Sequence, residues 1–146
     1  MKKVIISACL LGANCRYDGK EKVVNGLKQK YKDYEIIPFC PEAPLFGTPR
    51  QRISVVEIDG KNRIITDETN EDVTKKLEDE INSFVEENLN IKEIVLKSKS
   101  PSCGLGTTPI MNKEKKVIKF ANGIAAEIFT KTYKDIKIKN ELNYLK

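Results

Sequence analysis

The 146-residue chain contains no histidine. This absence excludes the usual general base of enzyme sites, the cysteine–histidine dyad and every zinc site that uses imidazole as a ligand. Any chemistry that the protein performs must therefore use the side chains of cysteine, aspartate, glutamate, serine, lysine, arginine and tyrosine.

Long hydrophobic runs are also absent, and no stretch approaches the roughly 20 apolar residues of a transmembrane helix. The N-terminus, with Lys2 and Lys3 ahead of Cys9, resembles a bacterial lipoprotein cleavage site. Its apolar run covers only residues 4–6, whereas a signal peptide needs an apolar segment of about 7 residues or more. We therefore expect a cytoplasmic protein whose cysteines are reduced thiols.

The length of the chain favours one domain over residues 1–146, large enough to bury a core without disulfides. The formal net charge is +5, and 32% of the residues are charged. Because the lysines are scattered along the chain, this charge is typical of a plain solvated surface and gives only weak support to an anionic partner.

Short β-branched segments alternate with amphipathic ones along the chain. Asp59-Gly60, between residues 54–58 and 63–66, is a strong signal for a β-hairpin. The order of the segments predicts an α/β fold, a single compact domain with a mainly parallel central sheet, helices on both faces and a small β-hairpin insertion. The predicted strands of the sheet are 4–8, 35–39, 92–96 and 135–139, and the predicted helices are 21–32, one running from Thr69 or Asn70 to about 87, and 121–133.

Three of the four cysteines lie at the end of a predicted strand or in the loop that follows it. Cys9 ends the first strand, Cys40 ends the second, and Cys103 lies in the loop after the third. The carboxyl ends of parallel strands lie at one edge of a sheet, so these cysteines should converge in space. Buried thiols are often ordinary core residues, but the Gly- or Pro-containing loop beside each of these favours a shared site.

The spacing of the cysteines leaves several chemistries open. No CxxC pair is present, and C-x5-C is not a common zinc spacing, so neither thiol–disulfide exchange nor a zinc knuckle is favoured. An iron–sulfur cluster accepts thiolates that are far apart in sequence. With three protein ligands, a four-iron cluster would keep one open iron, a Lewis acid for a soft ligand such as a substrate sulfur.

Several polar side chains lie beside the cysteines in the sequence. Glu42 is a candidate general acid or base, and Ser100 carries a hydroxyl that could position water. A solvated loop carboxylate and a turn-forming serine are the plain interpretations of these two residues. Candidates for binding or orienting a substrate, against the alternative of surface ion pairs or turn formation, are Arg16, Asp18, Arg50, Arg52 and Ser102.

Five motifs occur in one order along nearly the whole chain. They are SACLLG at 7–12, RYDG at 16–19, CPE at 40–42, TPR at 48–50 and SPSCG at 100–104. Together they resemble the thiouracil desulfidase family, long catalogued as a bacterial domain of unknown function. The chain departs from the common pattern at 43–46, where APLF replaces a more glycine-rich run, and this departure leaves the natural substrate open.

The resemblance implies an enzyme with a [4Fe-4S] cluster held by Cys9, Cys40 and Cys103 only. In this family the free iron takes the sulfur of a thiolated pyrimidine, and water supplies the oxygen that replaces it, without net redox change. Glu42 and Ser100 match the catalytic carboxylate and hydroxyl of the family.

Cys15 is not expected to be a ligand, because longer relatives often lack a cysteine there. The implied substrate is a thiolated nucleobase or nucleoside, with a thiolated tRNA as a further possibility. The alternative function is a non-catalytic iron–sulfur or zinc thiolate protein that acts as a sensor or interaction domain.

Overall fold

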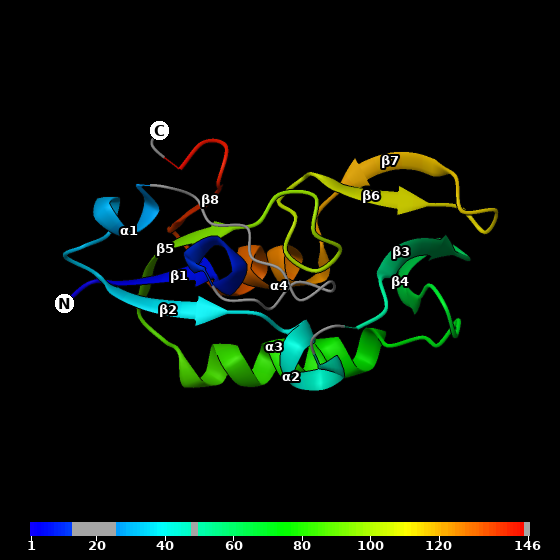
Figure 1. Ribbon diagram of the computed structural model, residues 1–146, viewed down its shortest axis with the longest axis horizontal. Helices are drawn as coiled ribbons and strands as arrows, with labels where there is room; N and C mark the ends of the chain where they lie inside the picture. The colour runs from blue at the N-terminus through cyan, green and yellow to red at the C-terminus, as the bar shows by residue number, and fades with distance from the viewer. Residues whose placement is uncertain (13–25, 48–49, 145–146) are drawn as a thin grey trace.

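The computed structural model describes residues 1–12, 26–47 and 50–144, and these residues form two four-stranded sheets (Figure 1). The first sheet is parallel throughout, with the strand order β2-β1-β5-β8. Its strands are β1 (Lys3–Ser7), β2 (Glu35–Phe39), β5 (Ile91–Leu96) and β8 (Lys137–Asn140). The predicted parallel sheet is therefore confirmed.

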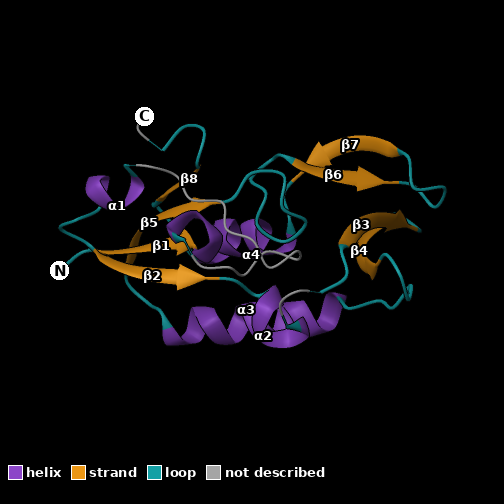
Figure 2. Ribbon diagram, in the orientation of Figure 1, coloured by secondary structure: helices purple, strands orange, loops and turns teal. Residues whose placement is uncertain are grey.

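Both faces of the first sheet are apolar, because side chains alternate between the faces along each strand. Val4 and Ile6 pack on one face and Ile5 packs on the other. Figure 2 shows helices on the two sides of this sheet. The short helices η1 (Ala8–Leu11) and α1 (Leu27–Lys30) cover the face of Val4, and α3 (Thr74–Glu87) and α4 (Ile124–Thr132) cover the face of Ile5. The prediction of helices on both faces is confirmed.

The second sheet has the strand order β4-β3-β6-β7. Its first two strands form the predicted hairpin around Asp59-Gly60, and residues 108–121 add a second hairpin that the sequence analysis did not predict. Val55 and Ile110 of this sheet are buried in the same core as Ile5, so the two sheets share one core. The strands are β3 (Ile53–Ile58), β4 (Lys61–Thr66), β6 (Thr108–Met111) and β7 (Val117–Ala121).

Helix α3 begins at Thr74, so the prediction of a start after Thr69 or Asn70 is wrong. Asn70 has a φ of 55°, in the left-handed region, which a helix interior does not accept. Val73 is the N-cap residue, and the Asp72 carboxylate just before it accepts a 3.0 Å hydrogen bond from the Thr74 amide.

Other helix boundaries also differ from the prediction. The described part of the predicted helix 21–32 is helical only at Leu27–Lys30, and residues 21–25 lie outside the described residues. Strand β1 ends one residue early, since Ala8 already belongs to η1. Helix α2 (Glu42–Phe46) replaces a predicted loop. Pro41 is its N-cap residue, a position whose amide has no acceptor within the helix, so that no hydrogen bond is lost to proline.

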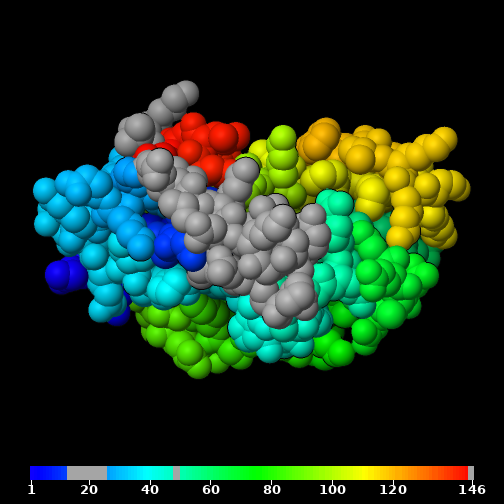
Figure 3. Space-filling view, in the orientation of Figure 1, coloured from blue at the N-terminus to red at the C-terminus, as the bar shows by residue number. Residues whose placement is uncertain are grey.

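The two ends of the molecule are formed by different parts of the chain. Figure 3 shows the segment of α1 at one end and the β6–β7 hairpin at the other. Within the part of the chain that the structure describes, no helix is long and apolar enough to cross a membrane.

Candidate active site

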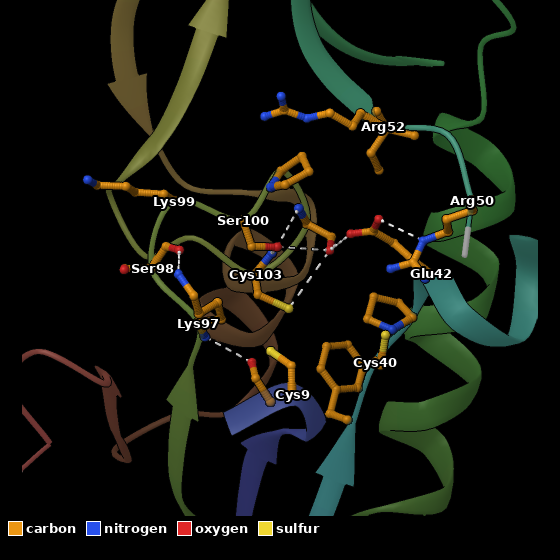
Figure 4. A pocket seen from close by; sticks show the side chains of 16 residues that line it. Cys9, Cys40, Glu42, Arg50, Arg52, Lys97, Ser98, Lys99, Ser100 and Cys103 are labelled. Carbon is orange, nitrogen blue, oxygen red and sulfur yellow. Dashed lines mark hydrogen bonds and ion pairs between the residues drawn. The ribbon is translucent and has the colours of Figure 1, made fainter. Parts of the chain in front are cut away.

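The strand ends of the first sheet bring three cysteines into one pocket (Figure 4). Cys9 lies in η1 directly after β1, Cys40 follows β2, and Cys103 lies in the loop that follows β5. Strand β1 pairs with β2 on one side and with β5 on the other, so the three strand ends are neighbours. The sheet topology therefore explains how residues far apart in sequence meet.

The pocket has a volume of about 300 Å³ and is partly sheltered from solvent. Cys9 and Cys103 are buried, Cys40 is half-buried, and none of the three forms a disulfide. Phe39 and Ile53 supply apolar walls. The remaining lining residues are Ser7, Pro41, Glu42, Arg50, Arg52, Lys97, Ser98, Lys99, Ser100, Pro101 and Ser102.

The donor set of this pocket fits an iron–sulfur cluster. Thiolates are the soft ligands that such clusters use, and they need only converge on a protected space, as Cys9, Cys40 and Cys103 do. Among the described residues, no three or more Cys, Asp or Glu side chains lie close enough together to hold a single metal ion.

Glu42 is the carboxylate of the pocket, and it is buried although it begins a short helix. Its Oε2 accepts a 2.7 Å hydrogen bond from the Ser102 hydroxyl. Its Oε1 lies 3.4 Å from Nε of Arg50, which also donates through Nη1 to the Gly47 carbonyl at 3.0 Å. A buried carboxylate needs such partners, and here both of its oxygens have one.

Ser100 organises the loop that carries Cys103. Its Oγ accepts hydrogen bonds from the amides of Ser102 and Cys103, at 3.3 and 3.1 Å. Its carbonyl accepts two more, from the Gly104 amide at 3.0 Å and the Thr108 hydroxyl at 2.6 Å. The turn-forming role that the sequence suggested for Ser100 is therefore present, and it holds the Ser100 hydroxyl at the pocket.

The environment of Cys103 favours the neutral thiol. Burial raises the pKa of Cys103 to about 12, and the nearby Cys40 and Glu42 act in the same direction. Hydrogen bonds to the side chains of Ser7 and Ser102 oppose this shift without cancelling it. A metal that binds at Cys103 must therefore displace the thiol proton, since thiolate is the ligand form.

The N-terminus of α4 holds the Cys103 loop from behind. The amide of Gly123 donates to the Gly104 carbonyl, and the amide of Ala125 donates to the Ser102 carbonyl, both at 2.7 Å. A Cβ at position 123 would lie 2.6 Å from the Ser102 backbone. Glycine at this position therefore permits the close contact, and the loop carbonyls replace a side-chain cap for the helix.

Lys97 and Ser98 also line the pocket, and the sequence analysis missed both. Glu141 accepts hydrogen bonds from the Ser98 amide and hydroxyl at 2.7 and 2.8 Å, and its Oε2 lies 3.3 Å from Nζ of Lys97. The Lys97 amide donates to the Ser7 hydroxyl at 2.9 Å. Their position directly after β5 was the available signal, because it matches that of Cys9 after β1.

The structure places only some of the predicted substrate-binding residues at the pocket. Arg50 and Ser102 line the pocket and both contact Glu42. Arg52 also lines the pocket and is exposed to solvent. Arg16 and Asp18, and with them Cys15, lie outside the described residues.

A parallel α/β sheet with thiols and a buried carboxylate at its strand ends has the architecture of an enzyme. The sequence model of the 2-thiouracil desulfurase family matches residues 4–141, so the chain belongs to this family. This membership confirms the family resemblance and the prediction of an enzyme that cleaves a carbon–sulfur bond.

Two known proteins are similar to this chain. The structure of the [4Fe-4S]-dependent thiouracil desulfidase TudS superposes with a TM-score of 0.78 at 31% sequence identity, covering 99% of this chain and 94% of TudS. The uncharacterized protein YbbK of Bacillus subtilis strain 168 is 28% identical over 113 residues, which are 70% of this chain and 74% of YbbK.

Proposed function

We propose that this chain removes sulfur from a thiolated pyrimidine such as thiouracil, using a [4Fe-4S] cluster held by Cys9, Cys40 and Cys103. One observation carries this proposal: three cysteines that form no disulfide and one buried carboxylate share a pocket of about 300 Å³ at the strand ends. The similarity to TudS, whose name states its dependence on such a cluster, supports the choice of cofactor.

When bound, the cluster supplies an iron atom with an open coordination position, which acts as a Lewis acid toward a soft thione sulfur. The protein's own task is to deliver water to the ring carbon that carries this sulfur. Glu42 accepts a proton from that water, and the Ser100 hydroxyl orients it. Oxygen replaces sulfur at the carbon and sulfur leaves as hydrosulfide, so no electron donor is needed.

The size of the pocket favours a small substrate. The volume of about 300 Å³ lies at the low end for ligand sites and includes the space that the cluster would take, so the rest suits one ring, the thiolated base of a free nucleobase or of a nucleoside. A thiolated tRNA could present its base only by turning it out of the stacked RNA. The basic lining residues Arg52 and Lys99 are exposed to solvent, where their charges can contact the phosphate groups of such an RNA. Arg16 and Asp18 of the RYDG motif complete the proposed substrate-binding set.

The test is anaerobic purification followed by iron and sulfide analysis and a hydrosulfide-release assay with 4-thiouracil. The proposal expects about four iron atoms per chain, as the cluster type requires, and release of one hydrosulfide per thiouracil converted to uracil. Iron without turnover on 4-thiouracil or its nucleoside would identify a sensor instead. Stoichiometric zinc without iron would identify a zinc-stabilised domain and overturn the proposal.

A further inference from the structure

Ser102 lies between the two side chains that the proposed reaction uses. Its Oγ donates to Glu42 Oε2 at 2.7 Å and lies 3.4 Å from the Oγ of Ser100. We infer that Ser102 is a positioning residue that fixes the Glu42 carboxylate beside the Ser100 hydroxyl, so that both groups face the same water. This inference rests on the proposed function and adds a third residue to its acid–base machinery.

The hydrogen bonds at each oxygen give the two serines different tasks. Ser100 Oγ already accepts two backbone amides, from Ser102 and Cys103, so its own hydrogen is the group that can orient the water. Ser102 Oγ gives its hydrogen to Glu42 and so holds the carboxylate in place. The two serine oxygens are 3.4 Å apart, so the carboxylate held by Ser102 lies beside the Ser100 hydroxyl.

The surroundings of Ser102 keep it in this position. Its side chain is buried, with 1% of the residue exposed, and its carbonyl accepts the Ala125 amide of α4 at 2.7 Å. Arg50 faces the other oxygen of Glu42, so the carboxylate cannot rotate without losing an ion pair. Both ends of the link between Ser102 and Glu42 are therefore held by the fold.

Ser102 takes no part in the proton transfer itself. Water, oriented by the Ser100 hydroxyl, gives one proton to Glu42, and the water oxygen forms the bond to the ring carbon. The bond from that carbon to sulfur then breaks, and Glu42 returns its proton to the departing sulfur, which leaves as hydrosulfide. The second proton of the water passes to solvent as C=O replaces C=S.

Ser102→Ala tests this positioning role, with Ser102→Thr as the variant that retains the hydroxyl. Ser54→Ala is the matched control, because the Ser54 hydroxyl donates a hydrogen bond of 2.6 Å to Asp67 in the hairpin, away from the pocket. Each anaerobic protein is assayed for iron and sulfide content, visible absorbance, and kcat and KM for hydrosulfide release from 4-thiouracil.

We expect Ser102→Ala to keep its iron, its spectrum and its KM, and to lose about 10²-fold in kcat, the lower end of what acid–base catalysis contributes. Ser102→Thr should recover most of that loss, and Ser54→Ala should match the wild type. A raised KM with unchanged kcat would make Ser102 a substrate-binding residue, and lost iron would make it structural. Either result, or an unchanged kcat, overturns the inference, while turnover by the wild type separately supports the proposed function.

Discussion

The hydroxyl of Ser102 donates a 2.7 Å hydrogen bond to the carboxylate of Glu42, although the two residues are 60 positions apart. Glu42 starts the helix that follows β2, and Ser102 lies in the loop that follows β5. Neither strand pairs with the other, because β1 lies between them. This single bond therefore connects helix α2 to the loop after β5, across the end of β1, where Cys9 is located.

Glu42→Gln should abolish most of the activity while leaving the cluster in place. The glutamine side chain has nearly the same shape and can still accept from Ser102, but its amide cannot take a proton from water. We expect kcat for hydrosulfide release to fall about 10²- to 10⁴-fold, the range for a lost general base. Glu57→Gln, which changes a carboxylate paired with Lys119 on the second sheet, is the control. Wild-type turnover by Glu42→Gln would remove Glu42 from the mechanism.

Cys103→Ala should prevent stable cluster binding, and Cys9→Ala and Cys40→Ala should do the same. With only three thiolates proposed, each loss leaves two, which are too few to hold the cluster against solvent. Iron and sulfide content after anaerobic reconstitution measures the effect. Cys15→Ala is the matched control and should keep the iron of the wild type. Full iron in Cys103→Ala, or its loss in Cys15→Ala, would contradict the proposed ligand set.

The first sheet could be predicted because its strands carry their own signals. Residues 35–39 and 91–96 are short, apolar and followed by loop-forming residues, and local pattern is enough to identify such strands. Strand β7 gives no such signal. Val117, Ile118 and Phe120 are each at least half exposed, so no alternation of burial marks the strand. It forms because β6 supplies a hydrogen-bonding partner.

The thiols of the site could be predicted, but the contacts among its polar groups could not. Cys9, Cys40 and Cys103 are each placed by the simple rule that parallel strands end at one edge. The bond between Ser102 and Glu42 depends on the path of two loops and on helix α2, which has only five residues and no periodic pattern. Such contacts follow from tertiary packing, which local sequence patterns do not record.

Gly123→Ala should displace the loop that carries Cys103. A Cβ there would lie 2.6 to 2.9 Å from backbone atoms of Ser102 and Pro101, which cannot move aside as a flexible side chain would. We expect a stability loss of about 1–3 kcal/mol, typical of overpacking, with reduced iron binding. Gly106→Ala is the control: it strains a residue with φ of 69° in the same loop but meets nothing within 4 Å. Urea unfolding and iron analysis measure both effects, and equal iron in the two variants would contradict the prediction.

Glu141 should make the stability of the fold fall in acid. Burial acts to raise the pKa of its carboxyl, but hydrogen bonds from Ser98 and the charge of Lys97 outweigh burial, so its pKa in the folded state lies below the ordinary value of 4.5. A carboxyl with a lowered pKa stabilises the folded state above its unfolded pKa, and this contribution is lost as pH falls through the folded pKa.

Glu141→Gln isolates this contribution, because glutamine does not titrate. At pH 7 the variant should be less stable by about 1.5–3 kcal/mol, the range for a hydrogen bond to a charged group. Below pH 4.5, the ordinary carboxyl value, the difference between the two proteins should shrink steadily. Urea unfolding of both proteins at pH 7, 5, 4 and 3, each a chosen assay condition, measures the difference directly, since every other carboxylate is common to the two. A gap as large at pH 3 as at pH 7 would show that Glu141 stabilises the wall of the pocket by packing and not by its charge.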